Sequence, residues 1–303
     1  MNRPAQKAIY LIFQIIKFKV SIFPRRMSLF FGRVLGLVFY HLDKRHRRVA
    51  LKNLTIAFGH SSSPRERRKI ARGSFMHFGQ VLMDLIKFMT LSPEKRDSLL
   101  TVSGGEHLVT ALGKGKGALI VTAHYGNWEM GISGLAQFGK VDVIARALDN
   151  EFIERALHDL RAHLGAKVIY KNQAVRQTFR ALEDNRIVAI LIDQNVLRDQ
   201  AIFVDFFGKK AATTPALAMF QLRSNAPVIP GFCYPTPSHK YHMQLYESVQ
   251  LTLSGDRETD VTAITQACTQ AIEEQIRQNP QYWLWFHDRW RTQPEVPFKS
   301  AKI

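Results

Sequence analysis

Short apolar runs alternate with amphipathic stretches along most of this 303-residue chain. The clearest run, Ala118–Thr122, follows a glycine-rich turn at Gly113–Gly117 that lacks the Gly-Lys-Ser/Thr ending of a phosphate loop. Strand-like runs occur at 118–122, 141–145, 167–170, 187–192 and 228–234, and helical patterns at 64–89, 127–137, 151–164, 174–184, 215–223 and 261–279. Because such alternation is typical of βαβ units, we predict an α/β fold with a mostly parallel sheet flanked by helices. In such folds, sites form beyond the carboxyl ends of the strands.

Positive charge is concentrated at the N-terminus. The formal net charge is +17, and residues 1–72 hold 17 basic side chains against two acidic ones, Asp43 and Glu66. This first quarter therefore carries +15, and the other residues form a nearly neutral chain. A local basic field attracts a polyanion, such as nucleic acid, an anionic bilayer surface or a phosphorylated substrate.

The same quarter contains two apolar runs, Ala8–Phe23 and Met27–Leu42. Two lysines interrupt the first run and Arg33 interrupts the second, so neither has the ~20 uncharged residues of a confident spanning helix. The lysines and the lack of a small-residue cleavage site also argue against a signal peptide. We predict that residues 1–42 anchor a domain of residues 43–303 by lying among anionic lipid headgroups. A tilted single span and a soluble amphipathic helix packed on the core are the alternatives.

The basic clusters and the cysteine content also bear on nucleic-acid binding and on disulfide or zinc chemistry. The basic clusters at 44–48 and 65–72 could contact nucleic acid, but no zinc-finger spacing or RNA-recognition signature accompanies them, so we expect no nucleic-acid partner. Cys233 and Cys268 are the two cysteines, which excludes a disulfide framework and a four-cysteine zinc site. The sequence leaves the oligomeric state open.

A polar cluster follows the run 118–122 directly. It contains His124, Gly126 and Glu129. Residues five apart lie about 140° apart on an ideal helix, so the imidazole and the carboxylate meet only if His124 stays on the loop and the helix begins near Asn127. The carboxylate could then orient the imidazole, whose free nitrogen would take a proton from a hydroxyl. An ordinary strand-to-helix turn capped by Asn127 is the alternative. The paired-histidine helix motif is absent, so we expect no metal.

The segment His124–Glu129 (HYGNWE) resembles the His-x4-Glu motif of the bacterial lipid A biosynthesis acyltransferases, the lauroyl/myristoyl transferase family within the lysophospholipid-acyltransferase-like superfamily. Related glycerolipid acyltransferases carry Asp where this chain has Glu129. The resemblance continues in order along nearly the whole chain, through Arg48–Leu54, Arg146, Arg161–Ala166, Asp193–Asn195, Phe203–Gly208, Thr213–Ala218 and Trp283–Trp290.

This resemblance implies an O-acyltransferase that moves a fatty acyl chain from acyl carrier protein to a hydroxyl of a lipid A precursor, at the cytoplasmic face of the bacterial inner membrane. Acyl carrier protein would be a co-substrate, and no cofactor is expected. His124 would be the general base and Glu129 its orienting partner. Alternatives are a phospholipid, another glycolipid or an aminoacyl lipid as acceptor, or a non-enzymatic basic protein that binds membranes or nucleic acid.

Three further residues are candidates for substrate binding. Arg161 could contact the oxyanion, a phosphate or the thioester, or it could be a surface residue in the last turn of a helix. Arg146 ends a strand run, where a ligand is expected, but it could pair with Asp149. Asp193 also ends a strand run and could hold Arg161 or the motif loop in place. The aromatic segment 282–290 could form an interfacial belt or pack in the core.

Overall fold

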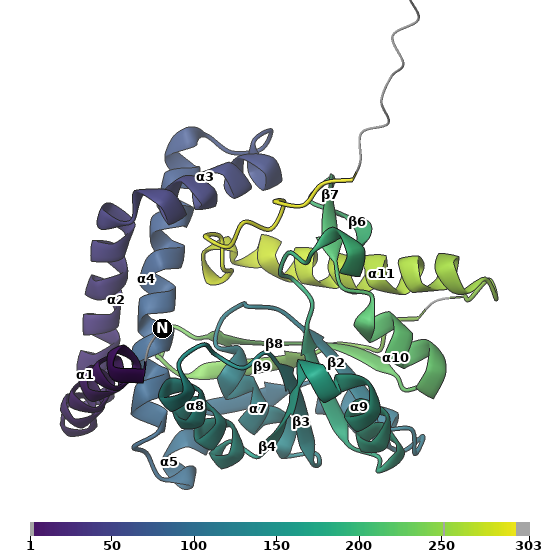
Figure 1. Cartoon of the computed structure of the whole chain (residues 1–303), viewed down its shortest axis with the longest axis horizontal. Coiled ribbons are helices and arrows are strands. Elements are labelled where there is room, and N and C mark those ends of the chain that lie inside the picture. The colour runs from purple at the N-terminus through teal and green to yellow at the C-terminus, as the bar shows by residue number, and fades with distance from the viewer. Residues whose placement is uncertain (1–2, 251, 295–303) are drawn as a thin grey trace, which may run out of the picture.

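The computed structural model describes residues 3–250 and 252–294. Residues 1–2 of the predicted anchor 1–42 and residues 295–303 of the predicted domain 43–303 lie outside the described residues. A seven-stranded sheet forms the centre of the molecule, in the order β1-β9-β8-β2-β5-β3-β4 (Figure 1). Neighbouring strands are parallel except for the antiparallel pair β8–β9. The strands are β1 (Leu100–Ser103), β2 (Ala118–Thr122), β3 (Val141–Ala145), β4 (Ala166–Tyr170), β5 (Ile187–Leu191), β8 (Val228–Pro235) and β9 (Tyr241–Leu245). The predicted mostly parallel sheet is confirmed.

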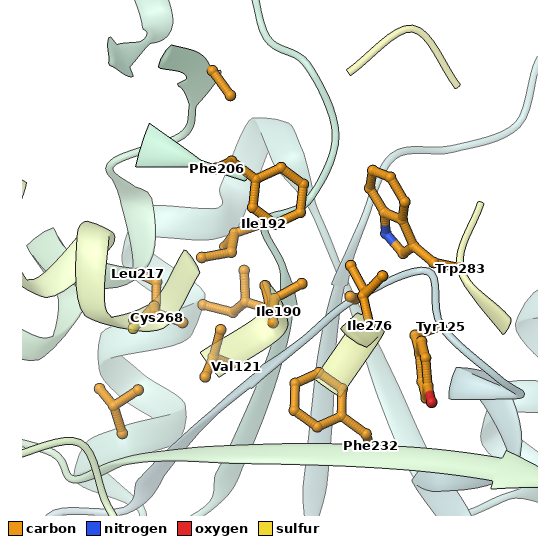
Figure 2. Packing of buried hydrophobic residues seen from close by; sticks show 14 of the residues in the cluster. Val121, Tyr125, Ile190, Ile192, Phe206, Leu217, Phe232, Cys268, Ile276 and Trp283 are labelled. Atoms are coloured by element: carbon orange, nitrogen blue, oxygen red, sulfur yellow. The ribbon is translucent and has the colours of Figure 1, made fainter. Parts of the chain in front are cut away.

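Helices cover both faces of this sheet. One core contains buried residues of α6 (Gly105–Leu112), α7 (Trp128–Ala136) and α8 (Glu151–His163). The other contains residues of α9 (Ala174–Glu183), α10 (Ala216–Ser224) and α11 (Arg257–Gln278). Figure 2 shows side chains of this second core, where Val121 and Ile190 of neighbouring strands meet residues of α10 and α11. Because both faces are buried, β2 reads as a continuous apolar run.

Several elements differ from the sequence prediction. The short strands β1 and β9 were not predicted, nor was the hairpin of β6 (Ile202–Phe206) and β7 (Lys209–Thr213). Helix α11 begins four residues earlier than predicted, because Asp256 caps it by accepting a hydrogen bond from Thr259 N. Three 3-10 turns complete the described elements: η1 (Lys171–Gln173), η2 (Arg198–Gln200) and η3 (Pro280–Tyr282).

Five helices precede or flank the start of the sheet. They are α1 (Arg3–Ile22), α2 (Arg25–Leu42), α3 (Lys44–Phe58), α4 (Pro64–Phe88) and α5 (Pro93–Asp97). Helix α4 begins at Pro64, as predicted, and its N-cap Ser63 forms a capping box with Glu66. Helices α2 and α4 lie side by side (Figure 1). Glycines allow their close approach: a Cβ on Gly36 would lie 2.1 Å from the carbonyl oxygen of Phe75, and one on Gly79 would lie 2.1 Å from that of Gly32.

Two buried charged residues of α4 fasten the first two helices. Asp84 accepts hydrogen bonds from the Arg25 guanidinium and from the hydroxyl of Tyr241 (2.7 Å). The Lys87 ammonium donates to the carbonyl oxygens of Val20, Ser21 and Phe23 at 2.8–3.0 Å, where α1 ends. A cation at a helix C-terminus satisfies its free carbonyls and stabilises its dipole.

Large apolar side chains remain exposed along both helices. They are Ile9, Leu11, Ile12, Ile15, Phe18 and Ile22 on α1, Phe23 in the turn, and Met27, Phe30, Phe31, Val34, Val38, Phe39 and Leu42 on α2. In the described residues, no helix combines the length and the apolar character that crossing a bilayer requires. The division of the chain into 1–42 and 43–303 stays a prediction.

Candidate active site

The His-x4-Glu motif forms a tight loop between β2 and α7. Gly126 has φ +59°, and a Cβ there would lie 2.0 Å from the carbonyl oxygen of Cys233, so only glycine fits. Helix α7 begins directly after Asn127, as predicted. The Asn127 side chain caps the helix, and its backbone N–H donates to the Cys233 carbonyl at 2.8 Å. The Gly126 N–H donates to the Tyr282 carbonyl at 2.9 Å. The loop is therefore fixed by strand β8 and by the C-terminal segment.

A buried histidine of α4 also holds this loop. The Nε2–H of His77 donates to the carbonyl oxygen of Gly126, 3.0 Å away. Complete burial lowers the pKa of His77 to about 4, with the Gly126 carbonyl opposing the shift. His77 is thus neutral near pH 7 and acts as a hydrogen-bond donor to the motif loop.

His124 is oriented by Asp193. The register pairs Thr122 of β2 with Leu191 of β5, so His124 and Asp193, each two residues further on, lie side by side. His124 Nδ1 is 2.9 Å from Asp193 Oδ1, and the His124 backbone N–H donates to Oδ2 at 2.9 Å. Trp283 donates its indole N–H to the same Oδ2 at 2.8 Å.

These contacts set the protonation pattern of the pair. Burial raises the pKa of Asp193, but the charge and hydrogen bonds of His124 and the Trp283 indole outweigh it, and the pKa lies below its usual value. An ionised carboxylate only accepts hydrogen bonds, so Nδ1 carries the imidazole proton and Nε2 of the neutral ring keeps its lone pair. The amide nitrogen of Gln194 lies 3.3 Å from Nε2. His124 is therefore arranged as a proton acceptor.

Glu129 has a different partner from the one predicted. Its carboxylate accepts two hydrogen bonds from Arg161, from Nε at 2.9 Å and from Nη2 at 2.6 Å, and one from the Trp128 indole at 3.2 Å. No hydrogen bond joins Glu129 to His124 in the described part of the chain. The expectation that Glu129 orients the imidazole is wrong in this structure, because Glu129 lies inside α7 and faces α8, whereas Asp193 lies at the same sheet edge as His124.

Arg161 uses two of its three guanidinium nitrogens to bind Glu129. Burial lowers the pKa of its guanidinium, but the hydrogen bonds and charge of Glu129 and the charge of Glu154 outweigh this, so the pKa is raised and the group stays cationic. The Nη1 atom is buried and has no hydrogen-bond partner within residues 3–250 and 252–294. The alternative of a surface arginine is excluded, since only 12% of the side chain is exposed.

The other arginine candidate is solvent-exposed. Arg146 follows β3, as predicted, and its Nη2 lies 3.4 Å from Asp149 Oδ1 with both side chains largely exposed. The pairing considered from the sequence is therefore present. Arg146 still borders the cavity described next, so the structure places it at the rim rather than beside the imidazole.

A cavity of 490 Å³ joins these residues. His124, Glu129, Arg161 and Gln194 provide its polar wall. Its deeper wall is apolar and lies between the sheet and helices α7 and α8, with Ile120, Ile132, Leu135, Val143, Ala189, Gly231 and Met243 among the lining residues. The volume is typical of a small-molecule site. A larger surface groove of 940 Å³ lies beside α9 and contains none of the predicted site residues.

Cys233 and the tryptophans of the aromatic segment 282–290 also border this region, and all of them are buried. Cys233 lines the cavity but is buried, which raises the pKa of its thiol and keeps it protonated. The aromatic segment 282–290 is core: Trp283, Trp285 and Trp290 are almost completely buried, so the predicted alternative of an interfacial belt is wrong. Figure 2 shows Trp283 packed beside Ile276 and Tyr125.

Sequence reasoning missed Gln194, Trp283, His77 and Arg289. Arg289 is completely buried and donates to the backbone carbonyl of Gln194 at 3.3 Å and to the hydroxyl of Thr213. Its pKa is lowered to about 10 by burial, with the charge of Asp193 opposing the shift. Gln194 adjoins a predicted residue and could have been found from that adjacency. Trp283 lies in an aromatic segment that the resemblance included, but nothing in the sequence connected it to Asp193, and His77 gave no local signal.

The fold and site define a class of protein: an α/β protein in which a buried carboxylate orients a histidine beside a partly apolar cavity. The family model of the bacterial lipid A biosynthesis acyltransferases matches residues 3–292, and the chain belongs to this family. It is therefore an acyltransferase of lipid or glycolipid biosynthesis.

Curated relatives fit this family. The phosphatidylinositol mannoside acyltransferase of Mycobacterium tuberculosis is 27% identical over 224 residues, covering 72% of this chain and 69% of the relative. The lipid A biosynthesis lauroyltransferase of Escherichia coli is 26% identical over 272 residues, covering 87% and 85%. The lipid A biosynthesis acyltransferase of Haemophilus influenzae is 24% identical over 265 residues, covering 86% and 80%.

Proposed function

We propose that this protein transfers a fatty acyl chain from acyl carrier protein to a hydroxyl of a lipid A precursor, with His124 as general base. The observation that carries the proposal is the Asp193-oriented imidazole of His124, which lines a cavity that has both polar and apolar walls. A thioester and an alcohol need a base, a place for the acyl chain and a donor for the oxyanion.

The reaction needs no covalent enzyme intermediate. The acceptor hydroxyl takes the place of the Gln194 amide at Nε2 and gives its proton to this nitrogen as its oxygen attacks the thioester carbonyl. The Asp193 carboxylate stabilises the imidazolium that forms. When the tetrahedral intermediate collapses, the carbon–sulfur bond breaks, and the leaving thiolate takes the proton back from Nε2.

Arg161 is the candidate donor to the developing oxyanion. Its spare Nη1 atom is already desolvated, and Glu129 holds the other guanidinium nitrogens at 2.6 and 2.9 Å, so the group is oriented before substrate binds. In this mechanism Glu129 acts through Arg161 as a positioning residue. The apolar part of the cavity, along Ile132, Leu135 and Val143, receives the acyl chain.

The N-terminal helices would bring the enzyme to its lipid substrate. Their exposed apolar side chains would enter the headgroup region, and the basic side chains of residues 1–72 would meet anionic lipid, the phosphorylated acceptor and acidic acyl carrier protein. We therefore place the protein at the cytoplasmic face of the bacterial inner membrane as a peripheral protein.

The test is transfer of a labelled acyl chain from acyl carrier protein to a purified lipid A precursor. We expect His124→Ala and Glu129→Ala to lower the rate at least 100-fold while both variants keep the wild-type circular dichroism spectrum and still pellet with membranes. Glu106→Ala, at an exposed site, is the matched control. Full activity of either site variant would overturn its assignment.

A second acceptor class has specific support. Relatives that match 72% of this chain are named phosphatidylinositol mannoside acyltransferases, so another glycolipid could accept the chain. Assays that offer lipid A precursor and phosphatidylinositol mannoside in parallel, each with acyl carrier protein and coenzyme A thioesters, would identify the acceptor and the donor.

A further inference from the structure

A second apolar space lies on the other side of the active-site wall. It is a groove of 300 Å³ along the line where α2 and α4 meet. Gly36 and Gly79 line it where the two helices approach each other, and Asp43 and His46, which pair at 2.7 Å, form a polar end. The apolar lining residues are Leu35, Phe39, Phe75, Phe78, Leu82 and Phe286.

Aromatic rings connect this groove to the base. The ring of Phe78 lies 5.9 Å from that of Trp128, and the ring of Trp128 lies 5.0 Å from that of His124. Phe78 lines the groove and Trp128 lines the 490 Å³ cavity, so the two spaces share this wall. Two ring contacts therefore connect the lining of the groove to the imidazole.

A side chain of the C-terminal segment, the imidazole of His287, provides a second connection. Phe286 lines the groove, and the next residue, His287, accepts a hydrogen bond from the backbone N–H of Asn195 at 3.0 Å. Asn195 follows Gln194, whose amide touches His124. The groove and the base thus flank the same short segment.

The surroundings of the groove indicate its occupant. Phe39 and Leu82 at its sides are 53% and 50% exposed, and Phe39 continues into the exposed apolar face of α2. The first turn of α3, beside the polar end, presents exposed Lys44, Arg45 and Arg48. An apolar groove that is open to an apolar face and has cations at one end matches a hydrocarbon chain with an anionic headgroup.

We propose that this groove binds one hydrocarbon chain of the lipid acceptor and so places the acceptor headgroup between the start of α3 and His124. The inference rests on the proposed function. It gives each of the two lipid substrates its own apolar site: the donor chain enters the cavity under α7 and α8, and the acceptor chain lies between α2 and α4. The base stands between them.

The test fills the groove. We expect Leu82→Trp to raise the KM for the acceptor about tenfold, because the larger side chain would occupy the space of the acceptor's hydrocarbon chain. The kcat and the KM for the donor stay unchanged. Val109→Trp introduces the same side chain at an exposed apolar position of α6 and is the matched control. An acceptor analogue that lacks one chain should bind the wild type about tenfold more weakly and bind Leu82→Trp no more weakly than the complete acceptor does.

Equilibrium binding of a fluorescent acceptor, measured without donor, separates this inference from the proposed function. A wild type that binds the acceptor in the groove but transfers no chain would contradict the function alone. Three results would overturn the groove assignment: an unchanged acceptor KM in Leu82→Trp, an equal change in Val109→Trp, or competition by phospholipid vesicles as strong as by the acceptor itself. Thermal melting of both variants verifies that they are folded.

Discussion

The N-terminal helices and the α/β domain use polar and apolar side chains in opposite ways. In α1 and α2 the large apolar groups face outward, while buried charges such as Asp84 and Lys87 hold the helices in place. In the α/β domain the apolar groups form the core, while charges gather at the strand ends around one cavity. The buried charges of the first region hold helices together, and we propose a chemical role for those around the cavity of the second. Substitutions should separate the two roles.

The largest effect should come from the chemical region. We expect Asp193→Asn to lower kcat about 10³–10⁴-fold, because an amide cannot stabilise the imidazolium or fix the Nδ1–H tautomer as a carboxylate does. The KM for the acceptor should change little. Steady-state kinetics and circular dichroism measure both points. A stable, fully active Asp193→Asn enzyme would remove the histidine–carboxylate pair from the mechanism.

The corresponding change in the structural region should affect stability. Asp84→Asn leaves the Arg25 guanidinium without its counter-ion in a site where Asp84 is fully buried. We expect the free energy of unfolding to fall by about 3–5 kcal/mol. Urea denaturation measures it. Asp205→Asn breaks an exposed ion pair with Lys210 and should cost no more than about 1 kcal/mol. Equal effects of the two variants would contradict the structural role.

His77 lies on α4 of the N-terminal region and donates a hydrogen bond to the motif loop of the α/β domain, so its substitution tests the contact between the two regions. Its pKa is about 4 in the folded protein, below the ordinary 6.5, so the unfolded state takes up a proton first as the pH falls. The neutral histidine should therefore contribute stability above pH 6.5 and lose about 3 kcal/mol of it as the pH falls toward 4. His77→Gln keeps an N–H donor and should lose less stability over this range. Parallel pH curves of the two proteins would refute the assignment.

The smallest effect concerns the outward apolar face. Phe30 is 61% exposed on α2, and we expect Phe30→Ser to weaken binding to anionic vesicles about tenfold. Vesicle sedimentation at high salt measures this, because salt screens charges but not buried apolar area. Val109→Ser, on α6, should bind like the wild type. If both variants bind equally, α2 does not face the membrane.

The sequence predicted those parts of the fold whose signals are local. Strand β2 matches the run 118–122 because five buried apolar or small residues lie between a glycine turn and a polar loop. Strand β9 was missed, although Tyr241, Met243 and Leu245 alternate with half-buried His242 and Gln244. Its pattern is clear only once β8 and β1 are known to flank it.

The structure brings four of the predicted site residues together, but sequence reasoning did not give their pairings and missed Gln194 beside His124. His124, Glu129, Arg161 and Asp193 all line or support one cavity. Glu129 was assigned to His124 because the two are neighbours in sequence. The actual partner follows from the parallel register of β2 and β5, which brings together residues 69 positions apart. Periodicity reveals that strands exist, but it does not give their order in the sheet.

The hydrogen bond from Trp283 to Asp193 spans 90 positions, and the backbone N–H of Leu284 donates to the carbonyl oxygen of His124. During synthesis the base and its carboxylate leave the ribosome long before these partners. The contacts around His124 and Asp193 are therefore complete only after segment 283–284 has docked, so a chain that ends before this segment lacks two of the hydrogen bonds that hold the pair.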